Sequence, residues 1–140
     1  MLEPPKPIHV LLVEDDEDTA RLVSRVLSIS VAASFVVTRA GDLQTALGLI
    51  EREPFDILLL DLSLPDGGSM STLAAAGAIA RHLPIAILTS SDEDDLVRLS
   101  ARVGVQEYLV KGEQGSRGLE RALLAAIERH HWVRYRDEAA

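Results

Sequence analysis

The sequence contains no cysteine, and aromatic residues make up only 4% of the chain. The absence of cysteine excludes a disulfide framework, a thiolate nucleophile, and zinc or iron–sulfur sites built on thiolates. The apolar runs are much shorter than the roughly 20 residues that a membrane-spanning helix needs, so we expect no membrane segment. Residues 1–7 hold three prolines and have no secretory character, which predicts a cytoplasmic protein. Any chemistry must therefore rely on oxygen and nitrogen groups.

Basic residues are also in the minority. The chain has 14 lysine and arginine residues against 22 aspartate and glutamate residues, for a formal net charge of -8. A field of that sign repels a phosphate backbone, so direct nucleic-acid binding is not expected. With 140 residues, of which 47% are hydrophobic, the chain is long enough for one domain with a substantial core.

Short apolar segments alternate with amphipathic ones along the chain. The apolar segments, rich in branched residues, predict strands at 8–13, 34–38, 55–60, 84–88 and 107–110. The segments between them, and the one after the last, have the apolar spacing of helices. This alternation predicts an α/β fold: a doubly wound, five-stranded parallel sheet with five helices. For such a sheet we expect the flavodoxin-like strand order 2-1-3-4-5, in which the first and third strands are neighbours. We expect a tail at 1–7, a domain at 8–130, and an extension of the last helix or a linker at 131–140.

Charged residues follow three of the predicted strands. Glu14 and Asp15 come after the first, Asp61 after the third and Lys111 after the fifth, while the hydroxyl of Thr89 follows the fourth. If the first and third strands are neighbours, the carboxylates converge, and each pair at ~4 Å repels by about 4 kcal/mol at an effective dielectric constant of ~20. A cation is then needed to keep them ionised, and an all-oxygen ligand set favours Mg²⁺, or Mn²⁺.

Four motifs stand at these strand ends: VLLVEDD, DILLLDLSLPDGG, AILTS and YLVKG. In this order and spacing, from residue 8 to about residue 129, the chain resembles the receiver domain of two-component response regulators. The resemblance implies that Asp61 is the phosphoacceptor and a metal ligand, and that Asp15 is a direct metal ligand. It further implies that Glu14 holds the metal through water and that the main-chain carbonyl of Ser63 completes the protein ligands.

The resemblance also implies a switch. Thr89 would be the hydroxyl that moves toward the phosphoryl group, Tyr108 the aromatic partner of that movement, and Lys111 the lysine that pairs with the phosphate. One residue departs from the family pattern, because Gly112 follows Lys111 where the family usually has proline.

The expected function is that of a phosphoacceptor in a phosphorelay, not that of an enzyme. The resemblance implies that a sensor histidine kinase or phosphotransfer protein would supply the phosphoryl group from a phosphohistidine. Phosphorylation would then change a surface made by the fourth helix, fifth strand and fifth helix, which would bind an output domain, another partner or a second copy in a homodimer.

Other interpretations compete with this one. A degenerate receiver would bind partners without phosphorylation. An aspartate-nucleophile phosphatase would need a second acid two residues after the nucleophile, where this chain has Ser63, and a flavin-binding protein would need a phosphate-cradling loop after the first strand. Taken alone, residues 14–16 could be a solvated helix cap and Tyr108 a half-buried strand residue. Trp132 and Tyr135 belong either to a frayed tail or to a helix that a partner covers.

Overall fold

The protein is described by a computed structural model covering residues 6–62, 69–79, 81–89, 94–111 and 117–139. Strands and helices alternate along the whole of this range. Their bounds are β1 Ile8–Val13, α1 Glu17–Ser28, β2 Phe35–Ala40, α2 Leu43–Arg52, β3 Ile57–Asp61, α3 Ser69–Ile79, β4 Ile85–Thr89, α4 Asp94–Arg102, β5 Glu107–Val110 and α5 Gly118–Ala139.

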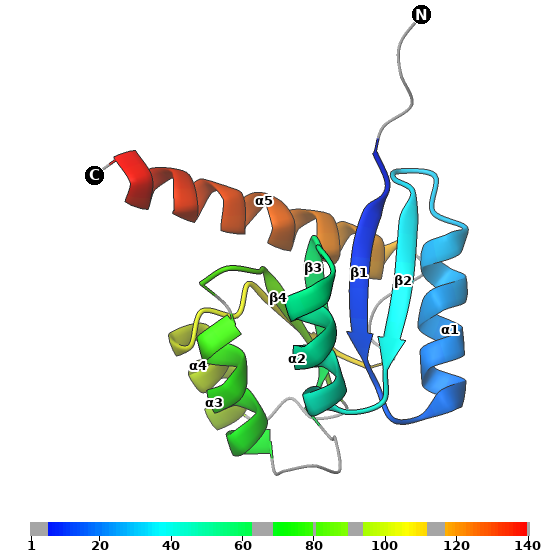
Figure 1. Ribbon diagram of the computed structural model, residues 1–140, viewed down its shortest axis with the longest axis horizontal. Helices are drawn as coiled ribbons and strands as arrows, with labels where there is room; N and C mark the ends of the chain where they lie inside the picture. The colour runs from blue at the N-terminus through cyan, green and yellow to red at the C-terminus, as the bar shows by residue number, and fades with distance from the viewer. Residues whose placement is uncertain (1–5, 63–68, 80, 90–93, 112–116, 140) are drawn as a thin grey trace, which may run out of the picture.

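The five strands form one parallel sheet in the order β2-β1-β3-β4-β5. This confirms the predicted fold class and strand order. The carboxyl ends of β1 and β2 lie at the bottom of the view in Figure 1. Because the strands are parallel, all five carboxyl ends meet at one edge, which we call the carboxyl edge.

Three strands extend further toward the carboxyl edge than the apolar pattern predicted. β2 continues to Ala40, β3 ends on Asp61, and β4 ends on Thr89. The reason is that backbone pairing does not depend on side-chain polarity: Asp61 is still paired with Leu88, and Thr89 with Val110. Asp61 and Thr89 are thus the last paired residues of their strands, which limits their backbone freedom.

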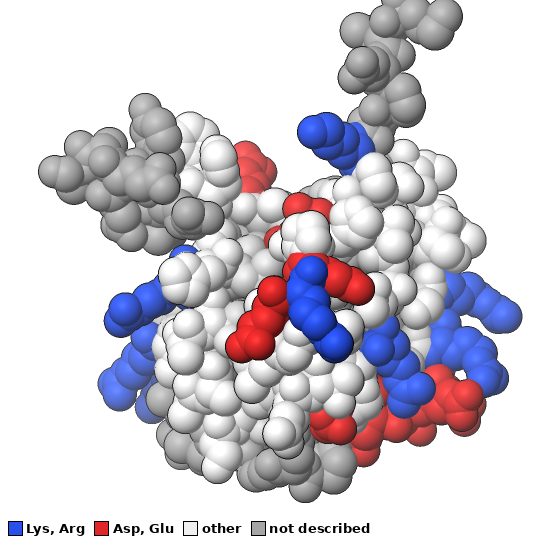
Figure 2. All heavy atoms as spheres, viewed as in Figure 1, with Lys and Arg blue, Asp and Glu red and all other residues white. Residues whose placement is uncertain are grey.

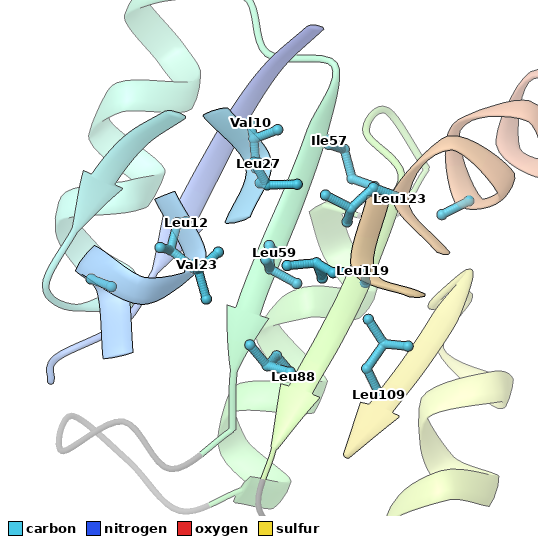
Figure 3. Close-up of a cluster of buried hydrophobic side chains, with 13 residues drawn as sticks. Val10, Leu12, Val23, Leu27, Ile57, Leu59, Leu88, Leu109, Leu119 and Leu123 are labelled. Carbon is cyan, nitrogen blue, oxygen red and sulfur yellow. The ribbon is translucent and has the colours of Figure 1, made fainter. Parts of the chain in front are cut away.

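Apolar side chains alternate between the two faces of the sheet. On β3, Leu58 and Leu60 join the core beside α2 and α3, while Ile57 and Leu59 join the core beside α1 and α5. Figure 3 shows the second of these cores, with Leu123 of α5 among the strand residues. Helices on both faces explain why the inner strands are apolar without interruption, as the predicted doubly wound architecture requires.

Capping side chains set the starts of α1 and α2. The carboxylate of Asp16 accepts a hydrogen bond from the backbone N–H of Thr19 at 2.9 Å, and Asp42 accepts one from Thr45 at 2.7 Å. Each cap satisfies a backbone N–H that the first turn leaves without a partner. The cap at Asp16 fixes how the chain turns from β1 into α1, next to the candidate site.

The last helix, α5, reaches beyond the sheet at its C-terminal end, as Figure 1 shows. Its buried residues extend to His130, whereas Trp132 is 57% exposed. The side chain of Tyr135 lies outside the described residues. Within the described part of the chain, no helix has the length and apolar character to cross a membrane.

Candidate functional site

The sheet register brings the two central acids together at the carboxyl edge. Val13 of β1 pairs with Leu60 of β3, so the next residues along the two strands are Glu14 and Asp61. One carboxylate oxygen from each of Glu14, Asp15 and Asp61 lies within 4.8 Å of the others. The convergence predicted from the sequence is therefore present, and these three residues form the acidic cluster.

Lys111, which follows β5, adds a positive charge to the acidic cluster. The Nζ of Lys111 lies 3.3 Å from Oε2 of Glu14 and 3.4 Å from Oδ2 of Asp61. Glu14 and Asp61 are 1% and 2% exposed, while Asp15 is exposed and Lys111 is partly exposed. The cluster thus has two buried carboxylates, one carboxylate open to solvent, and one ammonium group.

The buried charges influence each other strongly. Burial, reinforced by the neighbouring Asp61, raises the pKa of Glu14 from 4.5 to about 7. Burial alone would lower the pKa of Lys111, but the carboxylates of Asp61 and Glu14 outweigh it and raise the pKa above its usual value. Lys111 therefore stays charged, whereas the surroundings of Glu14 favour its protonated form more than water does.

The two carboxylate oxygens of Glu14 differ in their hydrogen bonding, and Oε2 is the one that a cation could bind. Its Oε1 accepts a hydrogen bond from the backbone N–H of Asp16 at 3.2 Å. Its Oε2 is buried and, although it lies near Lys111, accepts no well-oriented hydrogen bond within the described residues. A buried oxygen in that state is costly, and a hard divalent cation prefers such carboxylate oxygens. Glu14, Asp15 and Asp61 therefore fit a metal site.

The third acid of the run has a different task. Asp16 caps α1, and its carboxylate accepts hydrogen bonds from both the backbone N–H and the hydroxyl of Thr19. These bonds hold the pKa of Asp16 below its usual value. The helix-cap interpretation of residues 14–16 thus applies to Asp16, whereas Glu14 and Asp15 belong to the acidic cluster.

The remaining predicted switch residues lie along β4 and β5. Thr89 is buried at the end of β4, and its carbonyl accepts a hydrogen bond from the backbone N–H of Lys111 at 2.6 Å. Tyr108 is half-buried on β5, pairs with Ile87 and packs against the core beside α2 and α3. The main chain of Lys111 is thereby tied to Thr89 while its side chain reaches the acidic cluster. Ser63 and Gly112 lie outside the described residues.

Sequence reasoning missed one contact at this edge. Arg39 of β2 donates hydrogen bonds to the carbonyl oxygens of Glu14 and Asp15, each at 3.0 Å. The predicted second strand ended at residue 38, so Arg39 was left out of the sheet. An arginine at the end of an otherwise mostly apolar strand was the available signal.

The fold and the acidic cluster define an α/β domain with an acidic site and a lysine at the carboxyl edge. Comparison with known proteins agrees with this class: residues 10–123 match the model of the response regulator receiver domain family. The chain belongs to that family, which makes it a signalling domain of two-component systems.

Its curated relatives are longer proteins. The chain is 33% identical over 104 residues to the swarming motility regulation protein RssB of Serratia marcescens, covering 74% of this chain and 46% of that protein. It is 30% identical over 123 residues to the transcriptional regulatory protein CpxR of Escherichia coli, covering 88% of this chain and 50% of that protein. The chain thus spans about half the length of these relatives.

Solved structures share the fold. A CheY-like receiver domain protein from Methanospirillum hungatei superposes with a TM-score of 0.76 at 21% identity, covering 90% of this chain and 98% of that one. The chemotaxis protein CheY4 of Vibrio cholerae gives 0.73 at 24% identity, covering 86% and 99%. These likenesses support the architecture of the sheet and helices.

Proposed function

We propose that the chain accepts a phosphoryl group on Asp61 in a reaction that needs Mg²⁺, or Mn²⁺, in the acidic cluster. The observation that carries this proposal is the placement of Lys111 within 3.4 Å of both buried carboxylates, Glu14 and Asp61. When bound, the cation neutralises the charge that develops on the transferred phosphoryl oxygens. Asp15 and Asp61 would hold the cation directly, Glu14 would hold it through water, and the main-chain carbonyl of Ser63 would be a further ligand.

The protein's own part in the reaction is nucleophilic attack and charge pairing. A carboxylate oxygen of Asp61 attacks phosphorus, the P–N bond of a donor phosphohistidine breaks, and the leaving imidazole takes up a proton. An acyl phosphate on Asp61 is the product. Lys111, already placed beside Oδ2 of Asp61, pairs with a phosphoryl oxygen. The domain assists its own phosphorylation and dephosphorylation, and is not an enzyme acting on a separate substrate.

Thr89 and Tyr108 would transmit the effect of phosphorylation from Asp61 to the surface of the domain. The hydroxyl of Thr89 bonds a phosphoryl oxygen, and Tyr108, half-buried on β5, moves into the space that Thr89 leaves. The backbone bond between Lys111 and Thr89 couples the two strand ends that this movement involves. The population of two arrangements of the α4, β5 and α5 surface then shifts.

The partners follow from this role. A sensor histidine kinase or phosphotransfer protein supplies the phosphoryl group in the cytoplasm. An output domain, another partner protein or a second copy reads the α4, β5 and α5 surface, with no nucleic acid or membrane bound by this chain directly. The degenerate-receiver alternative is less favoured, because the acidic cluster, Thr89 and Lys111 are all retained.

The test is phosphorylation by acetyl phosphate with Mg²⁺, read as the gain of one phosphoryl group in the intact mass. We expect the unmutated chain to be labelled and Asp61→Asn to remain unlabelled, because an amide cannot form the acyl phosphate. Asp18→Asn, at an exposed position of α1, is the matched control and should be labelled normally. Labelling of Asp61→Asn to the same extent as the unmutated chain would refute the proposal.

A further inference from the structure

Arg39 binds the main chain just after β1, in the connection to α1 that holds residues 14–16, which we call the acidic loop. The backbone of Arg39 pairs with Leu12 of β1, and the Arg39 side chain reaches past the end of β1. Nε donates to the carbonyl oxygen of Glu14, and an Nη donates to the carbonyl oxygen of Asp15, both at 3.0 Å. One planar guanidinium thus binds two successive carbonyl groups, which lysine could not do with the same geometry.

The neighbouring backbone of β2 adds a third bond. The N–H of Glu14 donates to the carbonyl oxygen of Ala40 at 3.0 Å. β2 therefore holds both the N–H and the carbonyl of Glu14, and also the carbonyl of Asp15. These bonds fix the orientation of the peptide groups on both sides of Asp15, and with them the direction in which its side chain leaves the loop.

This matters most for Asp15, because its carboxylate is the exposed member of the acidic cluster. Glu14 and Asp61 are held in place by the packing around them, but a solvent-exposed carboxylate depends on its backbone for direction. Removing a group that does not touch the metal but orients one of its ligands commonly lowers metal affinity by about 10- to 100-fold.

We propose that Arg39 is a positioning residue that prepares the acidic loop for the divalent cation. This inference rests on the proposed function, since it assumes that the cluster binds Mg²⁺. It makes a prediction opposite to that of simple electrostatics. Removing a positive charge near a cation site should strengthen Mg²⁺ binding by Coulomb's law alone, whereas removing the grip on the two carbonyls should weaken it.

The experiment is a Mg²⁺ titration of the full chain, followed by the backbone amide shifts of the acidic loop and by the Mg²⁺-induced rise in the thermal midpoint. We expect Arg39→Met, which keeps the length of the side chain, to bind Mg²⁺ about tenfold more weakly. Arg39→Lys keeps the charge but has a single donor group, so its Mg²⁺ affinity should lie between those of the unmutated chain and Arg39→Met. The charge-matched control is Arg25→Met in the exposed last turn of α1, which should bind as tightly as the unmutated chain or slightly more tightly.

A second measurement separates positioning from a general loss of structure. At saturating Mg²⁺ the rate of phosphorylation of Arg39→Met by acetyl phosphate should recover to that of the unmutated chain, because only cation binding is impaired. If Arg39→Met does not fold, Arg39→Lys carries the test, since a weaker Mg²⁺ affinity at unchanged charge comes from the lost donor.

The outcomes are distinct. Equal or tighter Mg²⁺ binding by the folded Arg39 variants, in a chain that does bind Mg²⁺ and is labelled on Asp61, would overturn the role of Arg39 alone. An unmutated chain that neither binds Mg²⁺ nor accepts a phosphoryl group would overturn the proposed function and this inference together.

Discussion

Glu14 has two different surroundings at its two oxygens. Oε1 bonds the backbone of the loop, and Oε2 is buried near Lys111 without a well-oriented donor in the described part of the chain. The high pKa of Glu14, about 7, is the energetic sign of this situation. A divalent cation bound at the acidic cluster, as proposed above, would compensate the charge of Glu14.

The pH dependence of stability follows from that pKa. Between about pH 4.5 and 7 the folded chain keeps a proton on Glu14 that the unfolded chain has lost, so this group lowers the free energy of unfolding as pH rises. We expect Glu14→Gln, with divalent ions chelated, to stabilise the chain by roughly 1–3 kcal/mol at pH 8 and to have little effect at pH 4.5. Urea unfolding at the two pH values measures the difference.

The control for this prediction is Glu51→Gln, at an exposed position on α2, which should change stability little at either pH. Adding Mg²⁺ at pH 8 should stabilise the unmutated chain more than Glu14→Gln, because the cation binds the charged site. A stability gain of the same size at both pH values would show that burial of the charge is not the cause.

At the scale of elements, strand ends and helix starts set the geometry of the site. β3 and β4 end on Asp61 and Thr89, so ladder pairing holds the backbone of both residues. The cap at Asp16 and the hydrogen bonds from Arg39 hold the loop that joins β1 to α1. Asp61 and Thr89 therefore stand on paired backbone, whereas Glu14 and Asp15 stand on a loop that side-chain hydrogen bonds hold in place.

Two glycines provide a test of local backbone preference. Gly104, between α4 and β5, has a φ of 95°, a conformation that side-chain-bearing residues rarely adopt. Gly48 lies within α2, where an added Cβ would meet only the end of the Arg52 side chain at 3.8 Å. We expect Gly104→Ala to destabilise the chain by about 1–2 kcal/mol and Gly48→Ala to stabilise it by about 0.5–1 kcal/mol.

Chemical denaturation of both variants gives these values directly, and each serves as the control for the other. The substitution is the same in both, so the difference in sign isolates the backbone conformation. Two changes of the same sign would contradict this account.

At the scale of the whole molecule, two cores on opposite faces of the sheet support one functional edge. Figure 2 shows acidic side chains gathered at the lower right, over the start of α1, with basic side chains beside them along the same helix. The acidic first turn of α1 and the acidic cluster lie at the same end of the sheet, which suits the attraction of cations to this edge.

The last helix divides into a packed part and a projecting part. Leu123 and Ala126 are fully buried, and Arg129 forms an ion pair with Glu107, whereas Trp132 is largely exposed. We expect removal of residues 132–140 to change the free energy of unfolding by no more than about 0.5 kcal/mol, because the buried α5 residues among those described extend only to His130, before the cut. Leu123→Ala should cost about 2–4 kcal/mol.

Far-UV circular dichroism is the appropriate probe, because Trp132 is the one tryptophan of the chain and the truncation removes it. A loss of more than about 2 kcal/mol on truncation would place the domain boundary beyond residue 130.

The sequence by itself determined the fold class, and its likeness to a known fold supplied the expected strand order, which brings the acids together. Apolar runs such as IHVLLV and the charged residues after them are local patterns, and parallel topology forces their carboxyl ends together. Motif spacing identified the family, which the match over residues 10–123 confirms. The roles of Asp61, Asp15, Ser63, Thr89 and Tyr108 are predictions, and the labelling experiment above tests that of Asp61.

Only the tertiary structure decided which of three successive acids does what, and which group holds them. Asp16 became a helix cap, while Glu14 turned inward to Lys111, because the turn from β1 into α1 depends on packing that residue spacing does not encode. The contact of Arg39 with this loop could not be predicted from the sequence for the same reason. This contact joins residues 24 and 25 positions apart through strand register, and register exists only once the sheet has formed.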